Sequence, residues 1–262
     1  MASNDYEIQI VANLEELSRR VAEEFIYRAR EAIQMKGFFT GVLSGGSTPK
    51  SFYTSLASDQ YLDQVSWSKI HVFWGDERCV PPTHPESNFR MASDSLLSKV
   101  PIPKENIHRM PAEQEDHDHA AQEYEHMLKT FFHLKTGEYP RFDLVLLGMG
   151  DDGHTASLFP GTAALKETTR LVVANYIEKL HTYRLTLTAP AINYASNILF
   201  LISGETKASI LKEVVEGAYE PSRLPTQLIQ PVEGRLIFLA DRTAASKLTK
   251  ENPRTLWLSL WL

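Results

Sequence analysis

Residues 38–49, which read FFTGVLSGGSTP, indicate the class of fold. The apolar stretch 38–44 predicts a short buried strand that runs directly into Gly45 and Gly46. A helix is expected over residues 49–57, with Thr48 as its N-cap and Pro49 at its first position. A buried strand, a glycine turn and a helix in succession are typical of an α/β protein.

The same alternation extends to both sides of this stretch. Apolar residues from Leu14 to Ile33 recur at helical spacing before Gly37, a suitable C-cap, and a short strand precedes them at residues 7–11. Buried strands are expected at residues 70–74, 142–147, 183–188, 197–202 and 236–240, and helices around residues 89–100, 120–134, 206–216 and 244–250. The pattern predicts one α/β domain over residues 1–262, with a mostly parallel, doubly wound (Rossmann-like) sheet flanked by helices. In such folds ligands bind beyond the carboxyl ends of the strands, so the segments after the strands are where chemistry is expected.

Composition and charge exclude several classes of function. A net charge of −6 argues against general affinity for nucleic acid, although a local anion site stays compatible with it. The single cysteine, Cys79, excludes an intrachain disulfide framework. Residues 1–5 do not resemble a signal peptide, and no apolar run approaches the roughly 20 residues that span a bilayer. We therefore expect a cytoplasmic protein that binds neither membranes nor nucleic acid, either a monomer or a weak homo-oligomer. The apolar end, residues 256–262, is expected to dock on the body of the protein, with an oligomer contact as the alternative.

The loop after the first strand–glycine unit predicts an anion site. Gly45 and Gly46 let the backbone approach a ligand, while free amides and the helix dipole near Ser47 and Thr48 favour a phosphate. The alternative is an ordinary tight turn before a capped helix. The loop lacks the lysine of a Walker motif, which argues against a nucleoside triphosphate site.

A dense charged cluster follows the strand at residues 70–74. Asp76, Glu77 and Arg78 are followed closely by Asn88. Arg78 is suited to an anionic or oxyanion group, and a carboxylate to orienting a base or a sugar hydroxyl. The alternative is a structural ion-pair network. Cys79 is expected to be a buried small residue rather than a nucleophile.

The glycine-rich loop 147–161, LGMGDDGHTASLFPG, matches G-x-G-x-x-G after a strand. A dinucleotide site is disfavoured because Pro160 would break the long helix required there, and no strand ending in an acidic residue lies at the required distance downstream. The loop instead exposes His154 with Asp152 nearby, and an imidazole can take a proton from water near neutral pH. Ser157 does not lie in a G-x-S-x-G elbow, which disfavours a serine triad.

Two cations follow later strands. Arg184 lies in an otherwise apolar strand, and Lys207 opens a helix where the dipole disfavours a cation, which suggests an anion between them. The alternative for each is a surface salt bridge. The histidines at positions 108, 117, 119 and 126 are expected on a solvated helix face rather than around a metal.

These segments together resemble the 6-phosphogluconolactonase family. The resemblance runs in the expected order along nearly the whole chain, through residues 44–49, 74–81, 86–88, 148–161, 184–193, 204–207 and 216–217. That family is related to glucosamine-6-phosphate deaminases, which carry Asp-Glu-Tyr where this chain has Asp76, Glu77 and Arg78. Deaminases also continue Gly-His-Ile-Ala-Phe-Asn-Glu where this chain has residues 153–159, GHTASLF, so the glutamate expected to assist ring opening is missing. Residues 256–262 differ from the family pattern.

The resemblance implies hydrolysis of 6-phospho-D-glucono-1,5-lactone to 6-phosphogluconate, the second step of the oxidative pentose phosphate pathway, with neither metal nor organic cofactor. The expected partner is a small phosphorylated sugar lactone. The residues expected to hold its phosphate are Gly45, Gly46, Ser47, Thr48, Arg184 and Lys207. His154 is expected to act as the base and Arg78 to bind the oxyanion or hydroxyls, while Asp76, Asp152 and Asn88 orient His154 or the sugar. The competing hypothesis is a non-catalytic sensor of sugar phosphates, which would have no use for His154 beside Asp152.

Overall fold

The computed structural model describes residues 6–249 and 255–257. Its centre is a parallel sheet in the order β11-β1-β10-β9-β6-β2-β3-β5. Its strands, in chain order, are β1 (Glu7–Val11), β2 (Phe39–Leu43), β3 (Ile70–Trp74), β5 (Ile107–His108), β6 (Leu144–Leu147), β9 (Asn197–Ile202), β10 (Arg235–Asp241) and β11 (Thr255–Trp257). Every residue of β2 and β6 is buried, as expected for parallel strands covered on both faces. The predicted fold class is confirmed.

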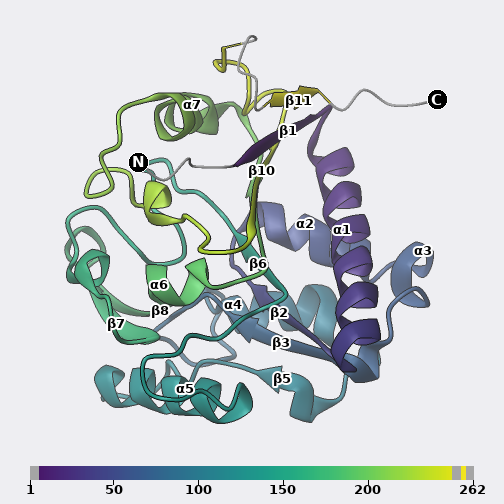
Figure 1. Ribbon diagram of the computed structural model, residues 1–262, viewed down its shortest axis with the longest axis vertical. Helices are drawn as coiled ribbons and strands as arrows, with labels where there is room; N and C mark the ends of the chain where they lie inside the picture. The colour runs from purple at the N-terminus through teal and green to yellow at the C-terminus, as the bar shows by residue number, and fades with distance from the viewer. Residues whose placement is uncertain (1–5, 250–254, 258–262) are drawn as a thin grey trace.

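Helices cover both faces of this sheet (Figure 1). The long helix α1 (Leu14–Lys36) lies with α2 (Ser47–Leu56) and α3 (Asp59–Leu62) along one flank. The other flank carries α5 (His117–Phe131), α6 (Ala189–Asn193) and α7 (Ala208–Glu216). A short helix, α4 (Asn88–Ala92), continues into a π-helical turn at Ser93–Leu97. No helix among residues 6–249 is long and apolar enough to cross a membrane.

A second, antiparallel sheet has the order β4-β8-β7 and was not expected from the sequence. It consists of β4 (Asp76–Arg78), β7 (Val172–Ile177) and β8 (Thr182–Leu187). The predicted strand at residues 183–188 is therefore correct as a strand, but it pairs here and not in the parallel sheet. This small sheet carries Asp76 and Arg78 opposite Thr186 and Arg184.

Two of the predicted helices need correction. Helix α2 begins at Ser47, and its N-cap is Gly46, not Thr48. Gly46 has a φ of +107°, which lets the chain enter the helix earlier, and Pro49 is tolerated because the first turn needs no donor from it. The helix predicted around residues 244–250 is absent from its described part, where turns hold residues 242–247. There Asp241 accepts hydrogen bonds from Ala244 N (2.8 Å) and Thr243 Oγ1 (2.7 Å), as an N-cap residue would, but the segment that follows forms only consecutive turns.

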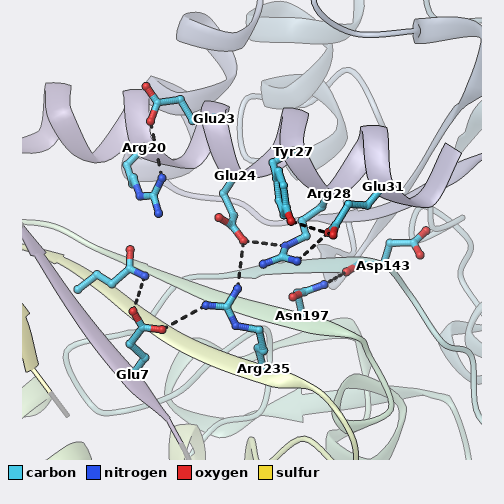
Figure 2. A network of polar contacts seen from close by, with 11 residues as sticks. Glu7, Arg20, Glu23, Glu24, Tyr27, Arg28, Glu31, Asp143, Asn197 and Arg235 are labelled. Atoms are coloured by element: carbon cyan, nitrogen blue, oxygen red, sulfur yellow. Dashed lines mark hydrogen bonds and ion pairs between the residues drawn. The ribbon is translucent and has the colours of Figure 1, made fainter. Parts of the chain in front are cut away.

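Polar contacts tie the sheet-facing side of α1 to strands β1 and β10 beneath it (Figure 2). Arg235 of β10 lies 3.2 Å from a Glu7 carboxylate oxygen of β1 and 3.7 Å from one of Glu24 in α1. Glu24 also pairs with Arg28 at 2.8 Å. Beyond β1, β11 adds a parallel edge strand, so this part of the apolar end docks on the body, as predicted; residues 258–262 lie outside the described residues.

The direction of winding reverses at β2. From β2 the chain adds β3 and β5 on one side, then returns to place β6 on the other side of β2, followed by β9 and β10. At such a switch point the loops after neighbouring strands diverge and leave a crevice at the carboxyl edge of the sheet. The loops after β2, β3, β6 and β9 meet there.

Candidate active site

A cleft of about 260 Å³ lies at this switch point. The ends of these strands and the segments that follow them, including the first turn of α2, strand β4 and the start of α4, supply its lining: Ser44, Gly45, Gly46, Ser47, Thr48, Pro49, Asp76, Arg78, Asn88, Gly148, Met149, Gly150, His154, Ala156, Leu201, Ser203 and Lys207. Nine of the eleven predicted site residues belong to this lining. The structure therefore brings together segments more than 150 residues apart in the chain.

The α2 end of the cleft offers backbone donors. No side chain caps the first turn of α2, so the amides that follow Gly46 are not taken by a cap. Ser44 lies beside them, and its buried Oγ has no hydrogen-bond partner among the described residues. An anion placed there would meet free donors and the positive end of the helix dipole.

Gly45 is required by the side chain packed against it. A Cβ at Gly45 would lie 2.0 Å from Oδ1 of Asn88. Asn88 is itself fixed, because its Nδ2 donates to the backbone oxygen of Asp76 at 2.9 Å. The glycine thus serves close packing of the cleft wall as well as the turn.

Asp76 and Glu77 have separate structural tasks. The buried Asp76 carboxylate accepts a 2.6 Å hydrogen bond from Ser157 Oγ, so that hydroxyl holds Asp76 rather than serving as a nucleophile. Glu77 is turned away from the cleft and accepts from the backbone N of Asn88 and of Phe89, each at 2.7 Å. Glu77 is therefore an anchor for the start of α4; its role is structural, but through backbone amides rather than the ion-pair network that was the alternative for the charged cluster.

Arg78 and Arg184 lie opposite each other on β4 and β8. Nη1 of Arg78 donates to the Glu86 backbone oxygen at 2.7 Å, while the Nε of each arginine is buried without a hydrogen-bond partner among the described residues. Burial, and then the neighbouring Arg78 guanidinium, lower the pKa of Arg184. Arg78 reaches the cleft but Arg184 does not line it, so direct phosphate contact by Arg184 stays a prediction.

His154 is held from two sides. Its Nδ1 lies 2.5 Å from Oδ1 of Asp152, and its ring stacks on Phe159 with centroids 3.9 Å apart. Partial burial opposes ionisation of Asp152, but hydrogen bonds from His154 and Lys179 hold the pKa of Asp152 well below its usual range. Asp152 thus lies outside the cleft lining, on the Nδ1 side of the imidazole. The other ring nitrogen, Nε2, does not contact Asp152.

Two lysines approach the glycine-rich loop. Lys207, at the start of α7, lines the cleft and forms an ion pair with the exposed Asp151. The salt-bridge alternative for Lys207 is therefore present in the structure alongside its place at the cleft. Lys179 pairs with the second oxygen of Asp152 and was missed from the sequence, where nothing distinguishes it from a surface lysine.

The remaining candidates do not form a second centre. No group of three or more His, Cys, Asp or Glu side chains able to hold a metal occurs among residues 6–249. Burial raises the pKa of the Cys79 thiol to about 11, which makes it a poor nucleophile. His108 is not on the helix face with His117, His119 and His126, but on β5 against His71.

Known proteins are similar to this chain in sequence and in fold. The family model of glucosamine-6-phosphate isomerases/6-phosphogluconolactonase matches residues 12–238. A 6-phosphogluconolactonase of Synechocystis is 44% identical over 242 residues, which cover 92% of this chain and 98% of the relative. The 6-phosphogluconolactonase structure from Trypanosoma cruzi superposes with a TM-score of 0.82 at 27% identity, over 94% of this chain and 98% of that one. A monomeric glucosamine-6-phosphate deaminase shares the fold, with a TM-score of 0.76 at 23% identity over 92% of this chain and 99% of that one.

Proposed function

The chain belongs to the glucosamine-6-phosphate isomerase/6-phosphogluconolactonase family, and from this membership we propose that it hydrolyses 6-phosphogluconolactone with His154 as the base. The observation that carries the proposal is the His154–Asp152 pair at one end of the cleft. The opposite end presents the start of α2, which no side chain caps. A phosphorylated sugar lactone has an anion at one end and an ester carbonyl at the other, and the cleft offers a group suited to each.

The phosphate is placed at the start of α2. The amides near Ser47 and Thr48 and the ammonium of Lys207 supply donors there, and the hydroxyl of Ser44 adds a donor that has no other partner among the described residues. Lys207 would exchange its exposed partner Asp151 for the phosphate, a small loss because surface ion pairs contribute little.

The reaction needs one base and one oxyanion donor. His154 Nε2 removes a proton from water as the water oxygen attacks the lactone carbonyl carbon. Asp152 holds the ring by Nδ1 and stabilises the imidazolium that forms. The tetrahedral intermediate then expels the ring oxygen, which takes the proton from His154, and the product is the open-chain acid. Arg78 lies on the cleft wall as the donor for the oxyanion or the sugar hydroxyls.

Replacement of His154 tests this role. In His154→Ala we expect kcat to fall by about 10²–10⁴-fold, because a general base contributes that much, with KM little changed. The measurement is acid release from fresh 6-phosphogluconolactone with the uncatalysed rate subtracted. The exposed His126 of α5, replaced by Ala, is the matched control.

Two further outcomes separate the alternatives. A parallel assay for ammonia release from glucosamine 6-phosphate should be negative. Near-normal turnover by His154→Ala would remove the base from the mechanism. Saturable binding of the sugar phosphate without any turnover by the unmodified chain would favour a sensor.

A further inference from the structure

Lys179 reaches His154 indirectly, through the two groups that hold the imidazole. Its ammonium forms an ion pair with Asp152 Oδ2, while Oδ1 of the same carboxylate contacts His154 Nδ1. The same ammonium lies 4.8 Å from the centroid of the Phe159 ring, on which His154 stacks. Lys179 therefore touches both supports of His154.

This lysine comes from a different part of the fold. It lies in the short helical turn Glu178–Leu180 between β7 and β8, the hairpin of the antiparallel sheet. His154 and Asp152 belong to the loop after β6 of the parallel sheet. Among the described residues, the Asp152 carboxylate pairs with two side chains, the imidazole of His154 and the ammonium of Lys179. The ion pair between Lys179 and Asp152 thus links the antiparallel sheet to the parallel sheet beside His154.

We propose that Lys179 is a positioning residue that sets the proton affinity of His154 by sharing the carboxylate of Asp152. An unshared carboxylate beside an imidazole strongly favours the protonated ring, which cannot act as a base. A second cation on that carboxylate opposes protonation of the imidazole. Lys179 thereby draws part of the carboxylate's charge away from the imidazole and fixes the carboxylate oxygen that orients it. This inference rests on the role of His154 proposed above.

The other charges near the imidazole do not replace this effect. They come from several elements: Asp151 on its own loop, Asp76 and Arg78 on β4, and Lys207 at the start of α7. Arg78 and Lys207 line the cleft and would be occupied by the substrate, while Asp76 is hydrogen-bonded to Ser157. Lys179 pairs with the other oxygen of Asp152 and does not belong to the cleft lining, so it does not compete for the substrate.

The test is the pH dependence of kcat in Lys179→Met. The rise of kcat on the acidic side of the profile, its acidic limb, follows deprotonation of the base in the enzyme–substrate complex. We expect this limb to move to higher pH by roughly 0.5–1 unit. The shift is modest because the Lys179 side chain is 53% exposed and partly screened. Lys179→Arg, which keeps the cation, should restore the original limb. Lys166→Met, at an exposed lysine of the nearby turn Ala163–Lys166, is the matched control and should not move it.

A second readout does not depend on turnover. In protein labelled with ¹⁵N-histidine, the His154 signal, assigned by its loss in His154→Ala, should titrate at higher pH in Lys179→Met. In an Asp152→Asn background the Lys179 substitution should no longer shift it, because the shared carboxylate is gone.

The outcomes distinguish this inference from the proposed function. An unmoved limb and an unmoved His154 titration in Lys179→Met would overturn the role of Lys179 while leaving His154 as the base. A purely structural role predicts lower kcat at every pH without a shift, and that result would also overturn it. An inactive unmodified chain, by contrast, would refute the lactonase proposal itself.

Discussion

His154 owes its position to a neighbour without a side chain. A Cβ on Gly150 would lie 2.1 Å from both Cε1 and Nδ1 of the His154 ring and 2.9 Å from Asp152 Oδ1. The backbone N of Gly150 also donates to the His154 backbone oxygen at 2.8 Å, which closes the loop tightly. The glycine at this position therefore serves the placement of an imidazole rather than a pyrophosphate.

Gly150→Ala should accordingly displace His154, the base in the proposed mechanism. We expect kcat to fall by about 10²-fold, because a shift of about 1 Å in a catalytic group costs that much. KM should change little, since the donors near Ser47 that are proposed to bind the phosphate lie elsewhere in the cleft. Steady-state kinetics measure both. Gly75→Ala is the control, as its Cβ would meet neighbouring atoms at ordinary contact distances of 3.6 Å and more; equal turnover in the two variants would contradict the steric argument.

The residues of the site differ in how visible they are in the sequence. His154 and the glycines around it were predictable because they follow an apolar strand within one short segment. Lys179 was not, because its partner Asp152 is 27 residues away and a lone lysine in a turn has no local signature. Glu77 was assigned correctly to a cluster, but only the structure shows that its carboxylate faces backbone amides.

At the scale of elements, the Glu77 carboxylate joins β4 to α4. Glu77 is 3% exposed and accepts from four donors: Arg78 N, Asn88 N, Phe89 N and Ser87 Oγ. A buried acceptor that satisfies several donors is costly to replace, because each donor left unpaired costs about 1–3 kcal/mol. The link also fixes Asn88 and Arg78 on the cleft wall.

Glu77→Gln should therefore destabilise the protein. The new amide group would set an N–H against backbone N–H donors, and we expect the free energy of unfolding to fall by about 1–3 kcal/mol. Urea denaturation followed by circular dichroism measures this. Glu86→Gln, on the exposed part of the same loop, should change the free energy of unfolding little. Equal stability of the two variants would show that the carboxylate is not the anchor.

The strands that could be predicted from the sequence are those in which nearly every residue is buried. The strands β2, β3, β6 and β9 are apolar runs between turn residues, and the sequence places each within a few residues. The small sheet was missed because β4 is only three charged residues long and β7 mixes apolar and polar side chains. Pairing between segments about 100 residues apart gives no local signal. The early start of α2 depended on the positive φ of Gly46, which propensity alone does not fix.

At the scale of the whole molecule, the parallel sheet ends at an edge built around two histidines. His71 Nδ1 lies 3.1 Å from His108 Nε2, between β3 and the two-residue strand β5. His108 also stacks on Phe73, with ring centroids 4.5 Å apart. Tyr124 OH donates to the His108 backbone oxygen and accepts from Trp74 N, each at 3.0 Å, so α5 is fastened to the same edge. The pair fits as neutral rings in which one nitrogen donates to the other.

This edge should make the protein sensitive to mild acid. Burial, then the neighbouring His71, lowers the pKa of His108 to about 4, and burial also lowers that of His71. The unfolded chain takes up these protons near pH 6.5, whereas the folded chain resists them. The contribution to stability is therefore complete above about pH 6.5 and is lost progressively as the pH falls toward 4, by on the order of 1 kcal/mol per pH unit for His108.

His108→Gln should flatten that dependence, because glutamine does not titrate. We expect the variant to be less stable than the unmodified chain at pH 8, where it loses the ring stacking, and to approach it at pH 5. Urea midpoints measured at half-unit intervals from pH 8 to pH 5 would show the two curves converging. His126→Gln, at an exposed position of α5, should run parallel to the unmodified chain. If the curve for His108→Gln also stays parallel to that of the unmodified chain, the acid sensitivity does not come from the β3–β5 edge.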